Sequence, residues 1–223
     1  MSADNFPSFT LGSANVTPMA VAAADATLPA RGIYCRPIAI TKIVTTTGQR
    51  LPVESANCHR VLPKEIADAG NYILQGDLTT SMGTAASDNI PRPAASKTGT
   101  ADNYMSAFFV GYTPDLLGAV WVGNPKSPKL HPMLGVPGSC WLTVGYCLGV
   151  MYGSMAPGKT WQLTFLHASL ANPPRNFVAV PQSSALFSLG NGQVSATPPS
   201  HHHSGGGGGG GGDHHHHGGG GGN

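Results

Sequence analysis

Four consecutive residues in the middle of the chain carry groups that could bind an anionic substrate: Lys97, Thr98, Gly99 and Thr100. The lysine ammonium supplies positive charge, and the threonine hydroxyls can hold a carboxylate. A glycine within a strand lets another backbone approach closely, so a peptide could lie beside it. This chemistry requires that the tetrapeptide line a cleft. Anywhere else the same four residues form the polar end of a strand.

A partner for this tetrapeptide in acyl transfer would be a serine nucleophile in a Ser-x-x-Lys motif. No serine of the 223 residues is followed by a lysine three residues later. A Ser-x-Asn pattern occurs at residues 13–15, 55–57 and 87–89, and the last of these is Ser-Asp-Asn. All three lie in stretches with loop composition, so we interpret them as solvated turns without a catalytic role.

Residues 153–160, Gly-Ser-Met-Ala-Pro-Gly-Lys-Thr, match the P-loop pattern of nucleotide-binding proteins letter by letter. A P-loop also needs a carboxylate for magnesium, and no Asp or Glu lies between Thr160 and Asp213. An acid earlier in the chain could take that place. Nucleotide binding is therefore kept as an alternative, against which the missing downstream carboxylate counts.

Composition excludes several function classes. Charged residues make up 10% of the chain, with a formal net charge of +2 and no basic cluster that could follow phosphates, so we expect no nucleic-acid partner. The chain has neither a signal-peptide pattern nor the roughly 18 apolar residues that span a bilayer. The histidines of residues 201–223 could bind transition metals, but we interpret this segment as a low-complexity tail, and we expect no metal site and no cofactor.

The elements that must position the tetrapeptide follow from local patterns. Strand-like runs occur at 94–100, 106–114 and 118–124, and the short connection between the last two predicts that they are antiparallel neighbours. A closing helix is expected over 160–171, with Trp161, Phe165 and Leu166 on its packed side.

Two further helices and a hairpin are predicted before these strands. An alanine-rich helix begins near residue 19, and β-branched runs on both sides of Thr47-Gly48 predict a hairpin. The clearest helix covers residues 62–80. Its apolar positions at helical spacing are Leu62, Ile66, Ala69, Ile73 and Leu74.

The four cysteines have no zinc-site spacing. Cys35 and Cys58 flank the predicted hairpin, which brings them near each other. A disulfide between them would indicate an oxidising compartment. The alternative is that Cys35, Cys58, Cys140 and Cys147 are four free thiols of a cytosolic protein.

Residues 92–125, "RPAASKTGTADNYMSAFFVGYTPDLLGAVWVGNP", resemble the end of the transpeptidase domain of bifunctional class A penicillin-binding proteins. Upstream, residues 7–44 and 58–79 are similar to the helix, hairpin and following helix of the same family, in the same order. The resemblance covers about residues 6–171 and is most specific between 92 and 124. It implies an α/β (α+β) fold, a partial penicillin-binding transpeptidase or serine β-lactamase-like fold with an antiparallel sheet flanked by helices.

The resemblance also implies roles for the tetrapeptide. Lys97 would place positive charge beside a proton-transfer serine, and the hydroxyls of Thr98 and Thr100 would bind the substrate carboxylate. The N–H of Thr100 would donate to the oxyanion, and Gly99 would leave room for the substrate peptide. In that family the Ser-x-Asn motif precedes the segment at 7–44, which also argues against a catalytic role for the three patterns above. Peptidoglycan stem peptides and β-lactams are the implied ligands.

At the level of the whole protein, the resemblance implies a peptidoglycan D,D-transpeptidase at the extracytoplasmic face of the bacterial cytoplasmic membrane, membrane-anchored and with cell-wall synthesis proteins as partners. That setting favours the Cys35–Cys58 disulfide. We expect residues 1–172 to be the C-terminal portion of a transpeptidase domain, truncated and inactive alone because it lacks the nucleophile. Residues 173–200 and 201–223 are expected to be a disordered tail and a Gly/His tail. The alternative is a non-catalytic module that binds peptidoglycan or a wall protein.

Overall fold

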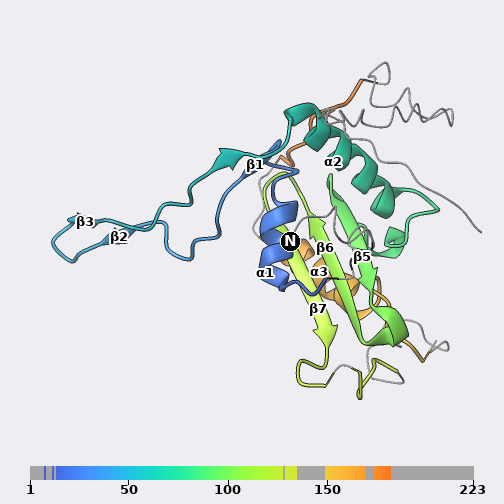
Figure 1. Cartoon of the computed structure of the whole chain (residues 1–223). Coiled ribbons are helices and arrows are strands. Elements are labelled where there is room, and N and C mark those ends of the chain that lie inside the picture. Colours follow the sequence, from blue (N-terminus) through green and yellow to red (C-terminus); the bar gives the residue numbers. More distant parts are fainter. Residues whose placement is uncertain are drawn as a thin grey trace, which may run out of the picture. The chain divides into compact units, whose positions relative to one another are not determined.

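The computed structural model describes residues 8, 12, 14–127, 129–134, 149–168 and 173–181 (Figure 1). The predictions for Cys140, Cys147 and the Gly/His segment fall outside these residues.

A three-stranded antiparallel sheet forms the centre of the described chain. Its strands are β5 (Ala95–Thr100), β6 (Ser106–Tyr112) and β7 (Leu117–Gly123), in the order β5-β6-β7. The register places Lys97 opposite Val110 and Thr100 opposite Ala107. The three predicted strands and their antiparallel pairing are confirmed. Among the described strands, β5 pairs on one side alone and lies at an edge of the sheet.

Helix α3 (Ala156–His167) covers one face of this sheet through Trp161. The indole lies 5.3 Å from the ring of Phe109 and is stacked on Phe165 at 4.4 Å. Its Nε1 donates to the carbonyl oxygen of Gly111 at 2.8 Å. A Cβ at Gly111 would come within 2.4 Å of the indole, so only a glycine lets the ring approach this closely. The predicted position of Leu166 on the packed side is wrong, since this side chain is 48% exposed.

Helix α1 (Pro18–Asp25) contacts β6 and β7, and helix α2 (Lys64–Thr79) contacts β5. Tyr112 alternates with Gly111 along β6 and therefore points to the face opposite α3. There its hydroxyl donates to Asn71 of α2 at 3.0 Å, while Leu78 of the same helix packs in the cluster around Phe109. Helix α2 thus runs beside β5 and reaches both faces of the sheet.

The predicted helix at 62–80 is confirmed, but its predicted apolar face is partly wrong. Ile66 and Ile73 are 44% and 66% exposed. The buried stripe contains Asp68 and Asn71 instead, because Asp68 accepts two hydrogen bonds from Arg31 and Asn71 donates to the Leu28 carbonyl. Polar side chains with such partners can be buried without the full desolvation penalty.

The predicted hairpin is confirmed as β2 (Ile43–Val44) and β3 (Arg50–Leu51), with Gly48 at a positive φ of 85° in the turn. It lies at the end of an arm whose base is the pairing of β1 (Ile33–Tyr34) with β4 (His59–Arg60), as Figure 1 shows. Cys35 and Cys58 form a disulfide beside this base, with their Cα atoms 4.1 Å apart.

The loop between α2 and β5 contains the short helix η3 (Ala86–Asp88), which is tied to α3 by an ion pair. The Asp88 side chain is fully buried, and its Oδ1 lies 2.7 Å from Nζ of Lys159. Its Oδ2 has no hydrogen-bond partner in the described structure. Burial raises the pKa of Asp88 above its ordinary value of 3.8, and the lysine opposes this shift only in part. The predicted solvated turn at 87–89 is therefore wrong for Asp88, although Ser87 and Asn89 are exposed.

Residues 173–181 lie within the segment predicted to be a disordered tail, yet two of them contact the strands and their connection. Arg175 forms an ion pair with Asp115 at 2.9 Å, and the ring of Phe177 meets that of Tyr112 at 5.8 Å. Composition predicted a disordered tail here. The structure differs because Arg175 and Phe177 each have a partner on the strands or their connection.

Replacing Trp161 by alanine should lower the free energy of unfolding by about 3–5 kcal/mol, because it leaves a large cavity between α3 and the sheet. Trp121→Ala is the matched control, since Trp121 is 37% exposed and should cost about 1 kcal/mol or less. Urea unfolding followed by circular dichroism measures both. Equal losses would contradict the assignment of Trp161 as the centre of the core.

Asp88→Asn should make stability less dependent on pH. The pKa of Asp88 is higher in the folded chain than in the unfolded chain. The stabilising contribution of this carboxyl to the free energy of unfolding is therefore complete below about pH 3.9 and is lost as the pH rises through the folded pKa. Asparagine does not titrate, so the variant should gain stability relative to the wild type between pH 4 and pH 7. Urea unfolding at both values tests this, and a relative loss of stability with rising pH would refute it.

Candidate functional site

The tetrapeptide Lys97–Thr100 occupies the C-terminal part of the edge strand β5. Side chains alternate along a strand, so Thr98 and Thr100 point to the same face as their partners Phe109 and Ala107, which is the face of α3. Lys97 belongs to the opposite face, and its Nζ donates to the Thr98 carbonyl at 2.9 Å. The two predicted hydroxyls therefore share one side of β5, whereas the ammonium must reach a ligand from the other side, at the edge.

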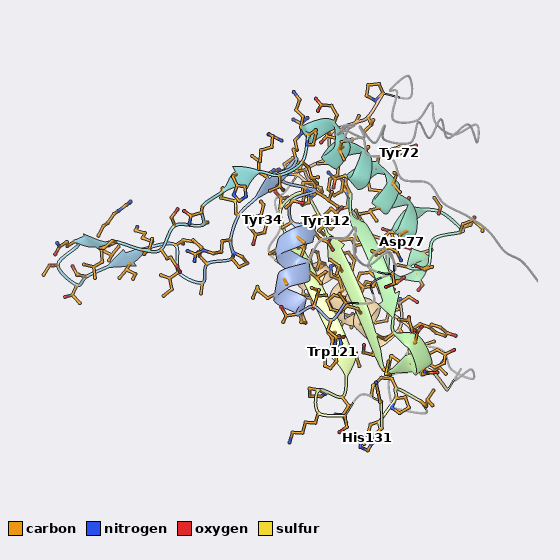
Figure 2. All side chains as sticks on the ribbon, in the orientation of Figure 1. Tyr34, Tyr72, Asp77, Tyr112, Trp121 and His131 are labelled. Atoms are coloured by element: carbon orange, nitrogen blue, oxygen red, sulfur yellow. A yellow bond between two sulfur atoms is a disulfide. The ribbon has the colours of Figure 1, made fainter. Side chains whose placement is uncertain are left out.

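Sequence reasoning did not find the carboxylate that anchors this strand, Asp77 of α2, which Figure 2 labels beside β5. Asp77 accepts hydrogen bonds from the Ser96 hydroxyl at 2.7 Å and from the backbone N–H and hydroxyl of Thr84 at 2.9 and 2.7 Å. The Thr84 hydroxyl in turn lies 2.8 Å from that of Thr98. No motif spacing could have indicated this network, because its members come from a helix, a loop and a strand.

The other end of the tetrapeptide is approached by Gly153. Its N–H donates to the Thr100 hydroxyl over a long 3.4 Å, and a Cβ on it would lie 2.9 Å from the N and O of Gly99. The residue that must lack a Cβ in this contact is Gly153, because a side chain on it would meet the backbone of Gly99. Thr100 itself remains exposed.

The turn after β5 holds two consecutive non-glycine residues in the left-handed region, Asn103 and Tyr104, with φ of 54° and 55°. The Tyr104 hydroxyl lies 3.4 Å from that of Tyr152, and this hydrogen bond raises the pKa of Tyr152 above its ordinary value. Such strain persists only where surrounding contacts impose it. The paired rings, 5.6 Å apart, therefore hold the turn that follows the tetrapeptide.

A cavity of about 570 Å³ lies beside this turn. Its lining includes Ala101, Met105 and Ser106 from the end of β5 and the start of β6, and Trp121 of β7, which Figure 2 labels. Lys129 contributes a cation to its lining. Apolar walls with few polar groups are typical of ligand pockets, and here they adjoin the end of the tetrapeptide strand.

The P-loop-like segment is organised differently from a phosphate loop. Lys159, the lysine that would contact phosphates, is bound to Asp88, and α3 already begins at Ala156 within the motif. In the described part of the chain, no three His, Cys, Asp or Glu side chains are grouped so that they could hold a metal ion. No described helix has the length and apolar character needed to cross a membrane.

The known proteins to which this chain is similar in sequence are penicillin-binding proteins. No protein-family model matches the chain. Penicillin-binding protein 1A of Aquifex aeolicus is 35% identical over 123 residues, which are 55% of this chain and 17% of that protein. The protein of the same name from Mycolicibacterium smegmatis is 34% identical over 152 residues, 65% of this chain and 18% of the relative. The chain thus spans less than a fifth of the length of these relatives.

The fold points to the same proteins. The crystal structure of penicillin-binding protein 1A from Haemophilus influenzae superposes with a TM-score of 0.58 at 19% identity, over 82% of this chain and 31% of that one. The expected α/β architecture, an antiparallel sheet flanked by helices, is confirmed. The chain is therefore similar, in sequence and in fold, to a transpeptidase-domain region of penicillin-binding proteins, as its residues predict.

Proposed function

We propose that this chain provides the Lys-Thr-Gly wall of a peptidoglycan D,D-transpeptidase site. The observation that carries the proposal is the position of Lys97–Thr100 on an edge strand with one side unpaired among the described strands. An edge strand can bind an extended peptide through its backbone groups. Peptidoglycan stem peptides and β-lactams are the proposed ligands, in keeping with the names of the similar proteins.

In this site Lys97 contributes charge, and the backbone N–H of Thr100 is the candidate oxyanion donor. An oxyanion-hole N–H typically contributes roughly 3 kcal/mol to catalysis, because it meets charge that develops in the transition state. The side chains of Thr98 and Thr100 lie on one side of the strand, near the backbone N–H of Thr100, where they can contact a bound substrate.

The acyl-accepting serine is not among the groups proposed for this chain, because no Ser-x-x-Lys occurs in its sequence. We propose that residues 1–223 alone do not form an acyl-enzyme. The active protein would need a segment with that motif and would work, membrane-anchored, at the extracytoplasmic face, where cell-wall synthesis proteins are candidate partners. A disulfide between Cys35 and Cys58 suits that compartment.

Fluorescent penicillin tests this function. The chain alone should remain unlabelled, whereas a longer protein in which a Ser-x-x-Lys segment precedes it should be labelled covalently. In that protein Lys97→Ala should slow acylation at least about 100-fold, since it removes the charge at the site. Lys42→Ala, which removes the same charge from the arm, should leave the rate unchanged.

Absence of labelling in the longer protein would refute the transpeptidase assignment. If the chain alone then retained muropeptides without a covalent adduct, the non-catalytic binding module would be the correct function.

A further inference from the structure

The hydrogen bonds around Asp77 fix the direction of each proton in the network. An ionised carboxylate can only accept, so Ser96 and both donors of Thr84 direct their hydrogens toward Asp77. Both Asp77 oxygens are engaged, Oδ1 by Thr84 and Oδ2 by Ser96. The carboxylate therefore determines what its neighbours can offer to other groups.

Thr84 has a single hydroxyl hydrogen, and it is used in the hydrogen bond that Thr84 donates to Asp77. The 2.8 Å contact between the hydroxyls of Thr84 and Thr98 must then be a hydrogen bond that Thr98 donates. The hydroxyl hydrogen of Thr98 is thus directed away from any substrate, and Thr98 presents lone pairs alone. A substrate carboxylate, which also carries only acceptors, gains no hydrogen bond from it.

Thr100 differs from Thr98 although both point to the same side of β5. Its hydroxyl oxygen accepts from the Gly153 N–H at 3.4 Å, so its hydrogen is not used in that contact. Its side chain is also exposed, whereas Thr98 is half-buried. Of the two hydroxyls, that of Thr100 can donate to an anion.

We propose that Asp77 is a positioning residue which, through Thr84, makes Thr98 a hydrogen-bond acceptor and assigns the substrate carboxylate to Thr100. This inference rests on the function proposed above and changes one expected role, because Thr98 no longer shares the carboxylate with Thr100. The substrate group that Thr98 can receive is instead a donor, such as a peptide N–H.

Binding of N-acetyl-D-Ala-D-Ala to the ¹⁵N-labelled chain, followed by amide shifts, tests this division. Thr100→Val should weaken binding about tenfold or more, as expected when a hydrogen bond to a charged group is lost. Thr98→Val should weaken it about threefold or less. In a Thr84→Val background, where the Thr98 hydrogen is released, Thr98→Val should cost about tenfold, and Thr84→Ser should behave as the wild type does.

Equal losses for Thr98→Val and Thr100→Val in the wild-type background would overturn the proposal. So would a Thr84→Val background in which Thr98→Val has the same small effect as before. If the wild-type chain binds no peptide at all, this wall alone does not suffice for binding, the fluorescent-penicillin experiment on the longer protein decides on the proposed function, and a second measurement decides on Asp77.

That second measurement needs no ligand. The hydroxyl proton of Thr98, observed by NMR in threonine-labelled protein, should exchange slowly with water and show a cross-peak to Thr84, while that of Thr100 exchanges rapidly. Thr84→Val and Asp77→Ala should abolish the protection of Thr98, and Thr84→Ser should retain it. Equally fast exchange of both protons in the wild type would refute the proposed direction. The β5–β6 amide pattern confirms that each variant is folded.

Discussion

The indole of Trp161 against the backbone of Gly111 is the contact on which the other features depend. It joins α3 to the central strand, and its N–H satisfies a carbonyl in the same contact. Burial of an aromatic ring of this size contributes more than any single polar contact in the chain, because apolar area dominates the balance of folding. Since Gly153 and Asp88 contact β5 and α3 respectively, both would lose their positions if α3 separated from the sheet.

Strand β5 is an edge strand that is held from two directions. On one side Asp77 bonds Ser96 and, through Thr84, Thr98; at the other end Gly153 lies against Gly99. An unsupported edge strand could shift its register or pair with another chain. Here two independent contacts prevent the shift while the edge itself stays unpaired by any described strand. A binding strand needs both properties, a rigid backbone and free hydrogen-bonding groups.

Local sequence patterns predicted the elements well and their polar contacts poorly. Strands β6 and β7 were predictable because β-branched and aromatic residues occur in both and the connection at residues 113–116 is short. Helix α2 was predictable from the helical spacing of its apolar residues. Its buried face was not, because Asp68 and Asn71 are buried only by virtue of Arg31 and Leu28, which are far away in the sequence.

The tetrapeptide shows the same division between local and distant information. Its residues were recognisable as a unit, since they are contiguous and lead into a matching strand. The hydrogen bonds that decide the behaviour of each hydroxyl come from Asp77, Thr84 and Gly153. An anion that competed for the Thr98 hydrogen would have to break its bond to Thr84, and the net value of a neutral hydrogen bond is only about 0.5–1.5 kcal/mol. A hydrogen bond to a charged group is worth about 1.5–3 kcal/mol, so this loss offsets part of the gain at Thr98 and none of it at Thr100. Two threonines that are equivalent in sequence therefore differ in affinity for an anion because of a carboxylate that contacts neither a substrate nor Thr98 itself.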